Sequence, residues 1–518
     1  MVKRISRLAS DQLLGVRIPP RAKITLSFMN YPIPKEIRAA VAILQSAGFE
    51  AYLVGGCVRD LLLKQQPKDW DITTSARPDK IQELFPDSFY ENKFGTVGVS
   101  TKSDDLALRT IEITPYRVEG KYSDKRHPDE VRFTDNLEDD LARRDFTINA
   151  MALTLIGGLA PSYKIIDPFN GQSDIKARII RAVGDPRERF AEDALRIIRA
   201  VRLAAELGFQ TEEHTVGALC QSALLLAHIA KERMRDEFSK TIMTKQPSQG
   251  LEALREYGIL KIFLPEIEEG YGVGQNKHHI YTVWEHNVRS VDYAARERWS
   301  LEVRLGALFH DIGKPRSKFG DGPDSTFYNH EIIGARMTQK IMERLRYPAQ
   351  VAAKVTKLVR YHLFYYNVDE VSESSVRRLI AKVGAQDMED LIRVRMCDRI
   401  GSGVPKAEPY KLRHFRFLVE KLQRDPVSVR MLKINGDRIK ELTGLPQGLN
   451  VGWILHALLD EVLEDPSDNN AEYLERRAKE LAALSENELR VLAEVGKNKK
   501  IGLEEEEVAK IKKRHWVK

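Results

Sequence analysis

The stretch Tyr52–Asp71, YLVGGCVRDLLLKQQPKDWD, decides the fold of the N-terminal part of the chain. Its apolar start, Tyr52–Val54, predicts a buried strand. Gly55 and Gly56 follow, where a backbone without side chains can turn sharply and approach a ligand closely. Arg59 comes within one helical turn of the glycines. The order of strand, glycine turn and arginine predicts a site for an anionic ligand at the end of the strand.

Two aspartates close the same stretch. Asp69 and Asp71 flank Trp70, and extended backbone would place both carboxylates on one face. Carboxylate oxygens are the ligands that Mg²⁺ prefers. Taken alone, a glycine pair is typical of a turn and Asp-x-Asp of a solvated loop, but the two together are far more specific. Backbone amides, an arginine and paired carboxylates are what metal-assisted phosphoryl transfer requires.

The combination of GGCVRD and DWD resembles the nucleotidyltransferase motif of class II tRNA nucleotidyltransferases (CCA-adding enzymes) and bacterial poly(A) polymerases. The resemblance runs from about Met29 to near Glu480 and is strongest between Tyr52 and Leu207. It implies an α+β fold, with a polymerase-β-like head of mixed sheet and helices, followed by an all-helical neck, HD body and tail. The expected divisions are a basic leader at 1–28, the head at 29–165, the neck at 166–270, the HD domain at 271–405 and the tail at 406–518.

Bulk properties agree with a globular protein of several domains. The chain has 518 residues, 42% of them hydrophobic and 30% charged, which predicts two to four domains. No apolar run reaches the roughly 18 residues of a membrane span. Lys and Arg total 82 against 75 Asp and Glu, a net charge of +7 that is compatible with a polyanionic partner. The three cysteines are scattered, which predicts neither disulfides nor a structural zinc site and fits the cytoplasm.

The leader at 1–28 is basic and lacks the apolar core of a signal peptide, so we expect a disordered arm and assign it no function. A helix is predicted over Ile33–Ala47, from its apolar spacing. Further strands are predicted over Phe94–Val99 and Leu106–Thr114. Glu112 ends the second of these, and its position matches the family's third metal-site carboxylate. Residues 117–133 are charged and aperiodic, which predicts a flexible loop.

A second string, RRDFTINAM, ends the stretch Leu137–Met151, whose acidic residues Glu138, Asp139 and Asp140 are expected in the first turn of a helix. An Arg-Arg-Asp cluster by itself is typical of a solvated face. The resemblance implies that Arg144 contacts the triphosphate and Asp145 the ribose. Arginine suits bidentate phosphate binding, and a carboxylate suits a sugar hydroxyl.

The string FAEDALRIIRAVRLAAEL predicts a strong helix over Phe190–Leu207. Its charges alone are typical of a surface helix with ion pairs. The EDxxR pattern resembles the family's nucleotide-selecting motif, in which Asp193 and Arg196 would read the edge of C or A without a template. Arg199 and Arg202 would reach phosphates or support these two side chains.

A second constellation follows the neck. HDIGKP after an apolar helical run resembles the HD phosphohydrolase domain, whose H…HD…D pattern implies four ligands here, namely His286, His310, Asp311 and Asp398. Imidazole and carboxylate ligands suit a divalent transition metal such as Zn, Mn, Ni or Fe. A metal held in this way can activate water against a phosphoester.

The predicted function is CCA addition, in which CMP from CTP and AMP from ATP are transferred to the 3′ end of tRNA with release of pyrophosphate. Asp69, Asp71 and Glu112 would hold Mg²⁺, and Gly55, Gly56, Arg59 and Arg144 would bind the triphosphate. The alternatives are a bacterial poly(A) polymerase, a partial enzyme that adds only CC or A, and an HD phosphohydrolase with an RNA-binding N-terminal part. No membrane partner is expected, and the oligomeric state is left open.

Overall fold

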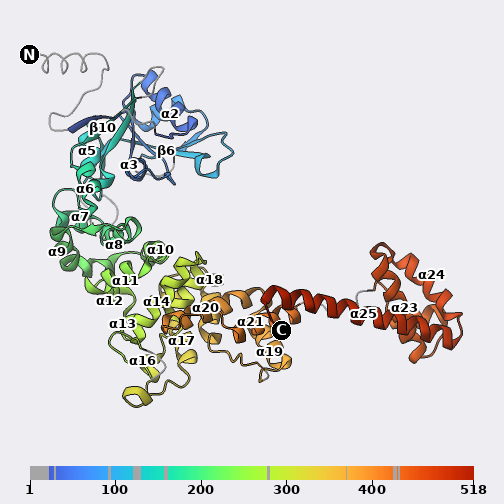
Figure 1. The fold of residues 1–518 in the computed structure, drawn as a ribbon. Coiled ribbons are helices and arrows are strands. Elements are labelled where there is room, and N and C mark those ends of the chain that lie inside the picture. Colours follow the sequence, from blue (N-terminus) through green and yellow to red (C-terminus); the bar gives the residue numbers. More distant parts are fainter. Residues whose placement is uncertain are drawn as a thin grey trace, which may run out of the picture. The chain divides into compact units, whose positions relative to one another are not determined.

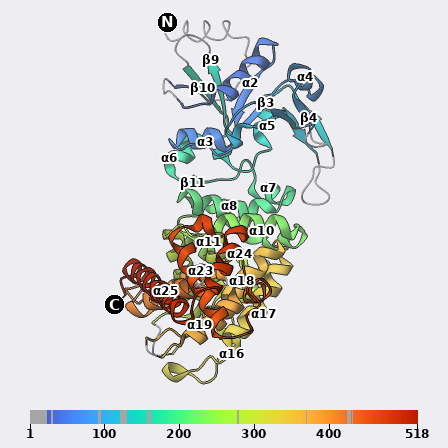
Figure 2. The same cartoon turned by 90° about the vertical axis from the view of Figure 1, so that its right-hand side faces the viewer.

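The computed structural model describes residues 23–27, 31–90, 95–120, 130–156, 162–276, 280–368, 370–423, 429 and 432–517. By backbone contacts the described residues up to Arg360, with Cys397–Gly403, form one compact unit, and the remainder forms a second. No helix of these described ranges is both long and apolar enough to cross a bilayer. Figures 1 and 2 show the chain in two orientations.

The head is built on one mixed eight-stranded sheet, as the α+β expectation requires (Figure 1). Only the β3–β6 pair is parallel, and the other six neighbouring pairs are antiparallel. In spatial order the strands are β1 (Lys23–Ser27), β10 (Ser162–Asp167), β9 (Ala152–Ile156), β2 (Ala51–Val54), β3 (Asp71–Thr74), β6 (Thr110–Pro115), β5 (Val97–Ser100) and β4 (Ser88–Tyr90).

Helices cover both faces of this sheet. On one face, α2 (Lys35–Ser46) buries Ile37, Ala40, Val41 and Leu44, the spacing that brings apolar side chains to one side of a helix. Each buried Leu or Ile contributes roughly 1.5–3 kcal/mol. The opposite face carries Tyr52 and Val54 against α5 (Leu137–Ala142). The other helices of the head are α3 (Gly56–Leu62), α4 (Pro78–Leu84) and α6 (Gly171–Ala177).

Three expectations for the head are corrected. Lys23–Ser27, placed in the leader, forms the edge strand β1 because its backbone pairs with β10; residues 1–22 lie outside the described part. Leu106–Leu108 is a 3₁₀ turn, because the Asp105 side chain accepts from the Ala107 N–H, and the strand begins only at Thr110. The two ends of the expected loop, β7 (Arg117–Glu119) and β8 (Val131–Phe133), pair as an antiparallel ribbon. Residues 121–129 between them lie outside the described residues.

Helices make up the rest of the first unit. The expected helix over Phe190–Leu207 is broken into α7 (Pro186–Glu192) and α8 (Leu195–Leu207), because Asp193 has extended backbone angles. A short parallel pair, β11 (Ile179–Ile180) and β12 (Gln210–Thr211), lies beside them. The remaining helices are α9 (Glu213–Ser222), α10 (Lys231–Ile242), α11 (Pro247–Glu256), α12 (Leu260–Phe263), α13 (Pro265–Glu268), α14 (Val283–Arg296), α15 (Leu301–Phe309), α16 (Lys314–Ser317), α17 (His330–Arg344) and α18 (Ala349–Tyr361).

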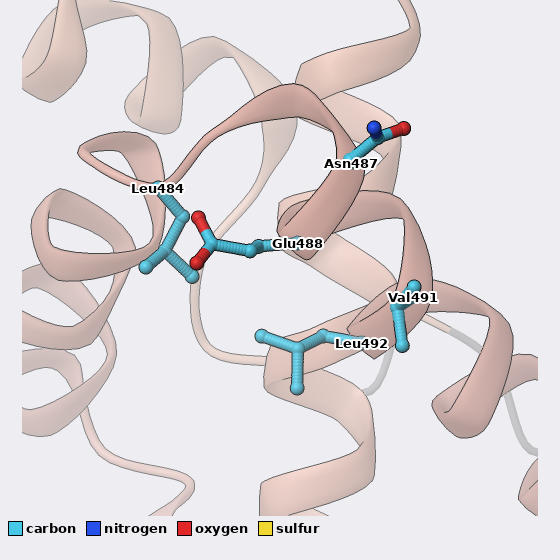
Figure 3. A pocket seen from close by; sticks show the side chains of 5 residues that line it. All are labelled: Leu484, Asn487, Glu488, Val491 and Leu492. Atoms are coloured by element: carbon cyan, nitrogen blue, oxygen red, sulfur yellow. The ribbon is translucent and has the colours of Figure 1, made fainter.

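The second unit is also helical. Leu484, Asn487, Glu488, Val491 and Leu492 line a shallow pocket at the start of its last helix (Figure 3). Glu488 is the only acidic group there, and it accepts from the backbone N–H and hydroxyl of Ser485, so it serves to cap the helix. The helices are α19 (Glu373–Val383), α20 (Met388–Gly401, which ends in the first unit), α21 (Tyr410–Gln423), α22 (Gly436–Thr443), α23 (Leu449–Glu464), α24 (Ala471–Ala482) and α25 (Glu486–His515).

Candidate functional site

Two carboxylates lie side by side on the head sheet. Asp71 begins β3 and is the register partner of Glu112 in the parallel β3–β6 pair, so both side chains project from one face. Glu112 stands in mid-strand and is exposed. Asp69 precedes them, exposed, with Trp70 buried between the two aspartates. The buried Trp70 between two less buried aspartates agrees with the expectation that Asp69 and Asp71 lie on the same face of extended backbone.

The environment of Asp71 favours a cation. Burial raises the pKa of its carboxyl, Arg144 counteracts part of the rise, and the negative charge of Asp69 adds to it. A divalent metal would relieve the repulsion between the carboxylates, and oxygen donors of this kind are the ones that hard divalent cations prefer. The three carboxylates Asp69, Asp71 and Glu112 therefore fit a divalent ion by the chemistry of their donors.

The glycine turn brings an arginine against this carboxylate face. Gly55 has φ +80°, and a Cβ at this position would lie 3.1 Å from Arg144 Nη1 and 3.3 Å from Asp71 Oδ2. A larger residue would thus be strained by its backbone and would also crowd the site. Arg144 Nε is buried without a hydrogen-bond partner among the described residues. It remains available to donate to an anionic ligand.

Arg59 and Asp145 are joined by a residue that sequence reasoning did not single out. Arg59 Nη1 donates to Asn149 Oδ1 at 2.9 Å, and Asn149 Nδ2 donates to Asp145 Oδ1 at 3.1 Å. Arg59 also donates to its neighbour Asp60, 2.8 Å away. Asn149 is buried and ends a 3₁₀ turn. The only signal was its place within the string RRDFTINAM.

A second missed residue is Asp140, which lies fully buried beneath the arginines. Its carboxylate accepts from Arg143 Nη2 at 2.7 Å and from Thr73 Oγ1 at 3.2 Å, and Arg144 Nη2 lies 3.5 Å away. Burial opposes ionisation, but Arg143 and Arg144 outweigh it and hold the pKa of Asp140 below its ordinary value. The sequence indicated only a first-turn acid in a helix, whereas Asp140 also anchors Arg144.

Helix α8 contributes Arg199 to the site. Its Nε forms an ion pair with Asp145 Oδ2 at 2.9 Å. Burial opposes ionisation of Asp145, but Arg199 and then Arg196 lower its pKa. Arg202, one turn later, bonds Glu237 on α10 at 2.8 Å and Glu206 at 2.6 Å. Arg199 therefore contacts Asp145 of the candidate site, whereas Arg202 links α8 to α10 through Glu237.

The two expected base-reading residues stand on either side of the helix break. Arg196 Nη1 donates to Glu192 Oε2 at 2.7 Å, and its Nη2 donates to the Arg143 carbonyl at 2.9 Å. Asp193 faces Arg233 of α10 in an ion pair of 2.7 Å. Sequence reasoning did not foresee the pairing of Arg233 with Asp193.

The HD constellation forms one buried cluster in the first unit. His286, His310, Asp311 and Asp398 each offer an atom within 4.8 Å of the others. His286 Nε2 lies 2.8 Å from His310 Nε2 and 3.2 Å from Asp311 Oδ2. Asp398 Oδ1 lies 3.4 Å from His286 Nε2. Two imidazoles and two carboxylates that converge in this way fit a divalent transition metal.

The cluster is oriented by its surroundings. His310 Nδ1 lies 2.8 Å from the Ala307 carbonyl, which turns Nε2 toward the cluster, as surrounding groups commonly orient metal-binding histidines. Burial alone would lower the pKa of His310, but Asp311 and Asp398 raise it to about 10. The ammonium of Lys314 lies 2.6 Å from Asp311 Oδ2. Lys314 and then His310 hold the pKa of Asp311 well below its ordinary value against the effect of burial.

Three family models match the chain in succession. The poly A polymerase head domain matches residues 51–181, and a model described as "Probable RNA and SrmB- binding site of polymerase A" matches residues 208–270. The HD domain matches residues 283–400. The head of the chain therefore resembles the head domain of the tRNA nucleotidyltransferase/poly(A) polymerase family. Members of this family depend on a divalent metal, in agreement with the carboxylates of the head.

Similar proteins carry the name CCA-adding enzyme. The chain is 43% identical over 242 residues to that of Geobacillus sp. (strain WCH70), covering 46% of this chain and 57% of the relative. It is 50% identical over 198 residues to that of Lactobacillus helveticus (strain DPC 4571), covering 38% and 47%. In these comparisons the chain spans about half the length of the curated relatives it matches.

The fold resembles the crystal structure of the Bacillus stearothermophilus CCA-adding enzyme in complex with CTP, with a TM-score of 0.55 and 28% sequence identity. That comparison covers 86% of this chain and 98% of the solved one. The fold class expected from the sequence is thereby confirmed.

Proposed function

We propose that the protein is a CCA-adding tRNA nucleotidyltransferase, which transfers CMP from CTP and then AMP from ATP to the 3′ end of tRNA and releases pyrophosphate. The observation that carries the proposal is the register pair Asp71–Glu112 beneath the Gly55 turn, with Arg144 against both the turn and the aspartate. The relatives named as CCA-adding enzymes and the similar structure with CTP support it.

Each residue has a role in this proposal. Asp69, Asp71 and Glu112 would hold Mg²⁺, which when bound supplies charge neutralisation for the triphosphate and lowers the pKa of the attacking 3′-hydroxyl. Arg59 and Arg144 donate to the triphosphate, which can approach the backbone closely at Gly55 and Gly56. Asp145 accepts from the ribose.

Base selection and the RNA contacts belong to the helices after the head. Asp193 and Arg196 read the base, and Arg199 supports Asp145. The domain divisions at residues 165, 270 and 405 remain part of the proposal, as does the cytoplasm as its place of action.

A second activity is proposed for the HD cluster. His286, His310, Asp311 and Asp398 would hold a transition metal, and the convergence of their ligand atoms within 4.8 Å favours this role. A divalent ion held there supplies a bound water of lowered pKa. The expected reaction is hydrolysis of a phosphomonoester or a cyclic phosphodiester, and a divalent transition metal is expected on the purified protein.

The first experiment is incorporation of labelled CTP and ATP with Mg²⁺ by the wild type, Asp69→Ala and Asp71→Ala. The RNA substrates are tRNA transcripts lacking CCA, transcripts lacking only the final A, and an unrelated RNA. Asp79→Asn, on the exposed first turn of α4, is the matched acidic control. We expect addition of C and A to tRNA alone, lost in both site variants and retained in the control.

The other outcomes assign the protein differently. Long A tails on any RNA would indicate a poly(A) polymerase, and addition of C without A would indicate a partial enzyme. Hydrolysis of phosphoesters without any incorporation would refute nucleotidyl transfer and leave the HD cluster as the active part.

A further inference from the structure

The break between α7 and α8 fixes one carboxylate in place. Asp193 stands at the break with φ −132° and ψ 102°. Its Oδ1 accepts from the backbone N–H of Leu195 at 3.1 Å, which satisfies a donor at the start of α8. The carboxylate is therefore tied to its own backbone and does not extend from a regular helix surface.

A distant arginine holds the same carboxylate from the other side. Arg233 Nη1 donates to Asp193 Oδ1 at 3.2 Å, and Arg233 Nη2 donates to Asp193 Oδ2 at 2.7 Å. This is a bidentate fork, which fixes the plane of a carboxylate as well as its position. Both side chains are mostly buried, with 26% of Arg233 and 18% of Asp193 exposed, so the pair is shielded from water.

The hydrogen bonds leave one acceptor position open. An ionised carboxylate has about four lone-pair sites. On Asp193 the backbone of Leu195 and the fork of Arg233 occupy three of them, two on Oδ1 and one on Oδ2. Among the described residues the remaining acceptor position is on Oδ2, and 18% of the Asp193 side chain is exposed.

This acceptor borders the candidate active site. On the helix that follows Asp193, Arg199 forms an ion pair with Asp145 at 2.9 Å, and Arg196 Nη2 donates to the Arg143 carbonyl at 2.9 Å. The first turns of α8, directly after Asp193, thus contact two residues of the RRDFTINAM string. Arg233 itself pairs with Asp193 and not with Asp145.

We propose that Arg233 is a positioning residue that sets base specificity, because it fixes Asp193 so that a single outward acceptor meets the base. The inference rests on the proposed function and extends it. Cytosine and adenine present an exocyclic amino donor, whereas uracil and guanine present a carbonyl acceptor at the matching position. A fixed carboxylate acceptor can accept from the amino group of cytosine or adenine. With uracil or guanine it would face the carbonyl oxygen of the base, and neither acceptor would have a hydrogen-bond donor.

Lysine cannot replace this fork. A lysine retains the positive charge for an RNA phosphate but offers a compact ammonium in place of two parallel N–H groups. In Arg233→Lys the carboxylate would turn about its Cβ–Cγ bond and admit water between itself and the base. The discrimination would fall while the charge of α10 stays constant.

The test compares Arg233→Lys and Arg233→Gln with Arg235→Lys and Arg235→Gln. Arg235 lies on the same helix and bonds its neighbour Asp236 and the Arg346 carbonyl, so it controls for the loss of an arginine from α10. The readouts are kcat/KM for CTP against UTP and for ATP against GTP, and the KM for tRNA. We expect both Arg233 variants to lose about tenfold to a hundredfold of the discrimination, and both Arg235 variants to keep it.

The outcomes separate specificity from RNA binding. Lower discrimination in Arg233→Lys with an unchanged KM for tRNA supports the proposal. Wild-type discrimination in both Arg233 variants, whatever happens to the KM for tRNA, overturns it. Circular dichroism confirms that each variant is folded.

If the wild type incorporates no nucleotide, the proposed function fails while this inference remains testable by calorimetric binding of CTP and UTP. A preference for CTP that is lost in Arg233→Lys would still support it, and a preference kept in that variant would refute it.

Discussion

Replacing Asp140 by Asn removes a buried negative charge from between two arginines without changing the volume of the side chain. Asp140 is fully buried, 2.7 Å from Arg143 Nη2 and 3.5 Å from Arg144 Nη2. Removing one partner of a buried ion pair costs about 3–5 kcal/mol, because the opposite charge stays uncompensated. For a unit of a few hundred residues each kcal/mol lowers Tm by about 2–4 °C, so we expect a loss of about 6–20 °C.

The assay is urea and thermal unfolding at pH 7, with Asp139→Asn as the control. Asp139 is the neighbouring acid of the same helix, but it is only half-buried and accepts from the Thr134 hydroxyl, so its replacement should cost about 1 kcal/mol. The KM for CTP should rise only in Asp140→Asn, because Arg144 loses its anchor. Unfolding free energies of the two variants within 1 kcal/mol of each other would refute the reasoning.

The pH dependence gives a second check on the same pair of variants. The folded-state pKa of Asp140 is lowered, so its contribution is fully present above the unfolded-state value of about 3.9. It is lost as the pH falls through the lower folded-state pKa. The stability difference between wild type and Asp140→Asn should therefore be large at pH 7 and shrink below about pH 4. A difference independent of pH would show that the charge is not its cause.

Three further changes separate other parts of the molecule. Gly55→Ala should lower stability by about 1–2 kcal/mol through backbone strain and should also lower kcat/KM for CTP. Gly48→Ala is the control, because Gly48 has φ +87° and a Cβ there would have no neighbour within 4 Å, so only stability should fall. Equal activities of the two variants would contradict this. His310→Ala should abolish the binding of a transition metal, as measured by elemental analysis of the purified protein, and should abolish any phosphoester hydrolysis. Incorporation of CTP should persist in this variant. Glu237→Gln should lower the free energy of unfolding by about 1–3 kcal/mol and with it the urea midpoint, because Arg202 loses one of its two carboxylate partners and keeps Glu206; an unchanged midpoint would refute that role.

The sequence predicted the local features best. The strand Ala51–Val54, the turn at Gly55 and the helix Lys35–Ser46 all form close to where their patterns place them, because apolar spacing and glycine act over a few residues. The grouping of His310 and Asp311 in one cluster was expected from the resemblance to the HD motif, and not from the spacing of these residues alone.

Features that depend on side chains binding the backbone were not predicted. The helix that begins at Leu137 ends at Ala142, and the Asp145 carboxylate accepts from the Phe146 N–H, which is an alternative to helical pairing. The helix break at Asp193 is similar, since its carboxylate is held by Arg233, 40 residues along the chain. Periodicity carries no information about partners at such separations.

Strand β1 has a consequence for how the protein is prepared. Its residues Lys23–Ser27 pair with Tyr163–Asp167 of β10, the strand next to it in the head sheet. Deleting the first 27 residues would leave the N–H and C=O groups of β10 that face β1 unpaired along a sheet edge. Such an edge is a template for strand addition by another molecule. A shortened protein should therefore self-associate as its concentration rises, in a way that reflects the missing strand and not the assembly of the full-length protein.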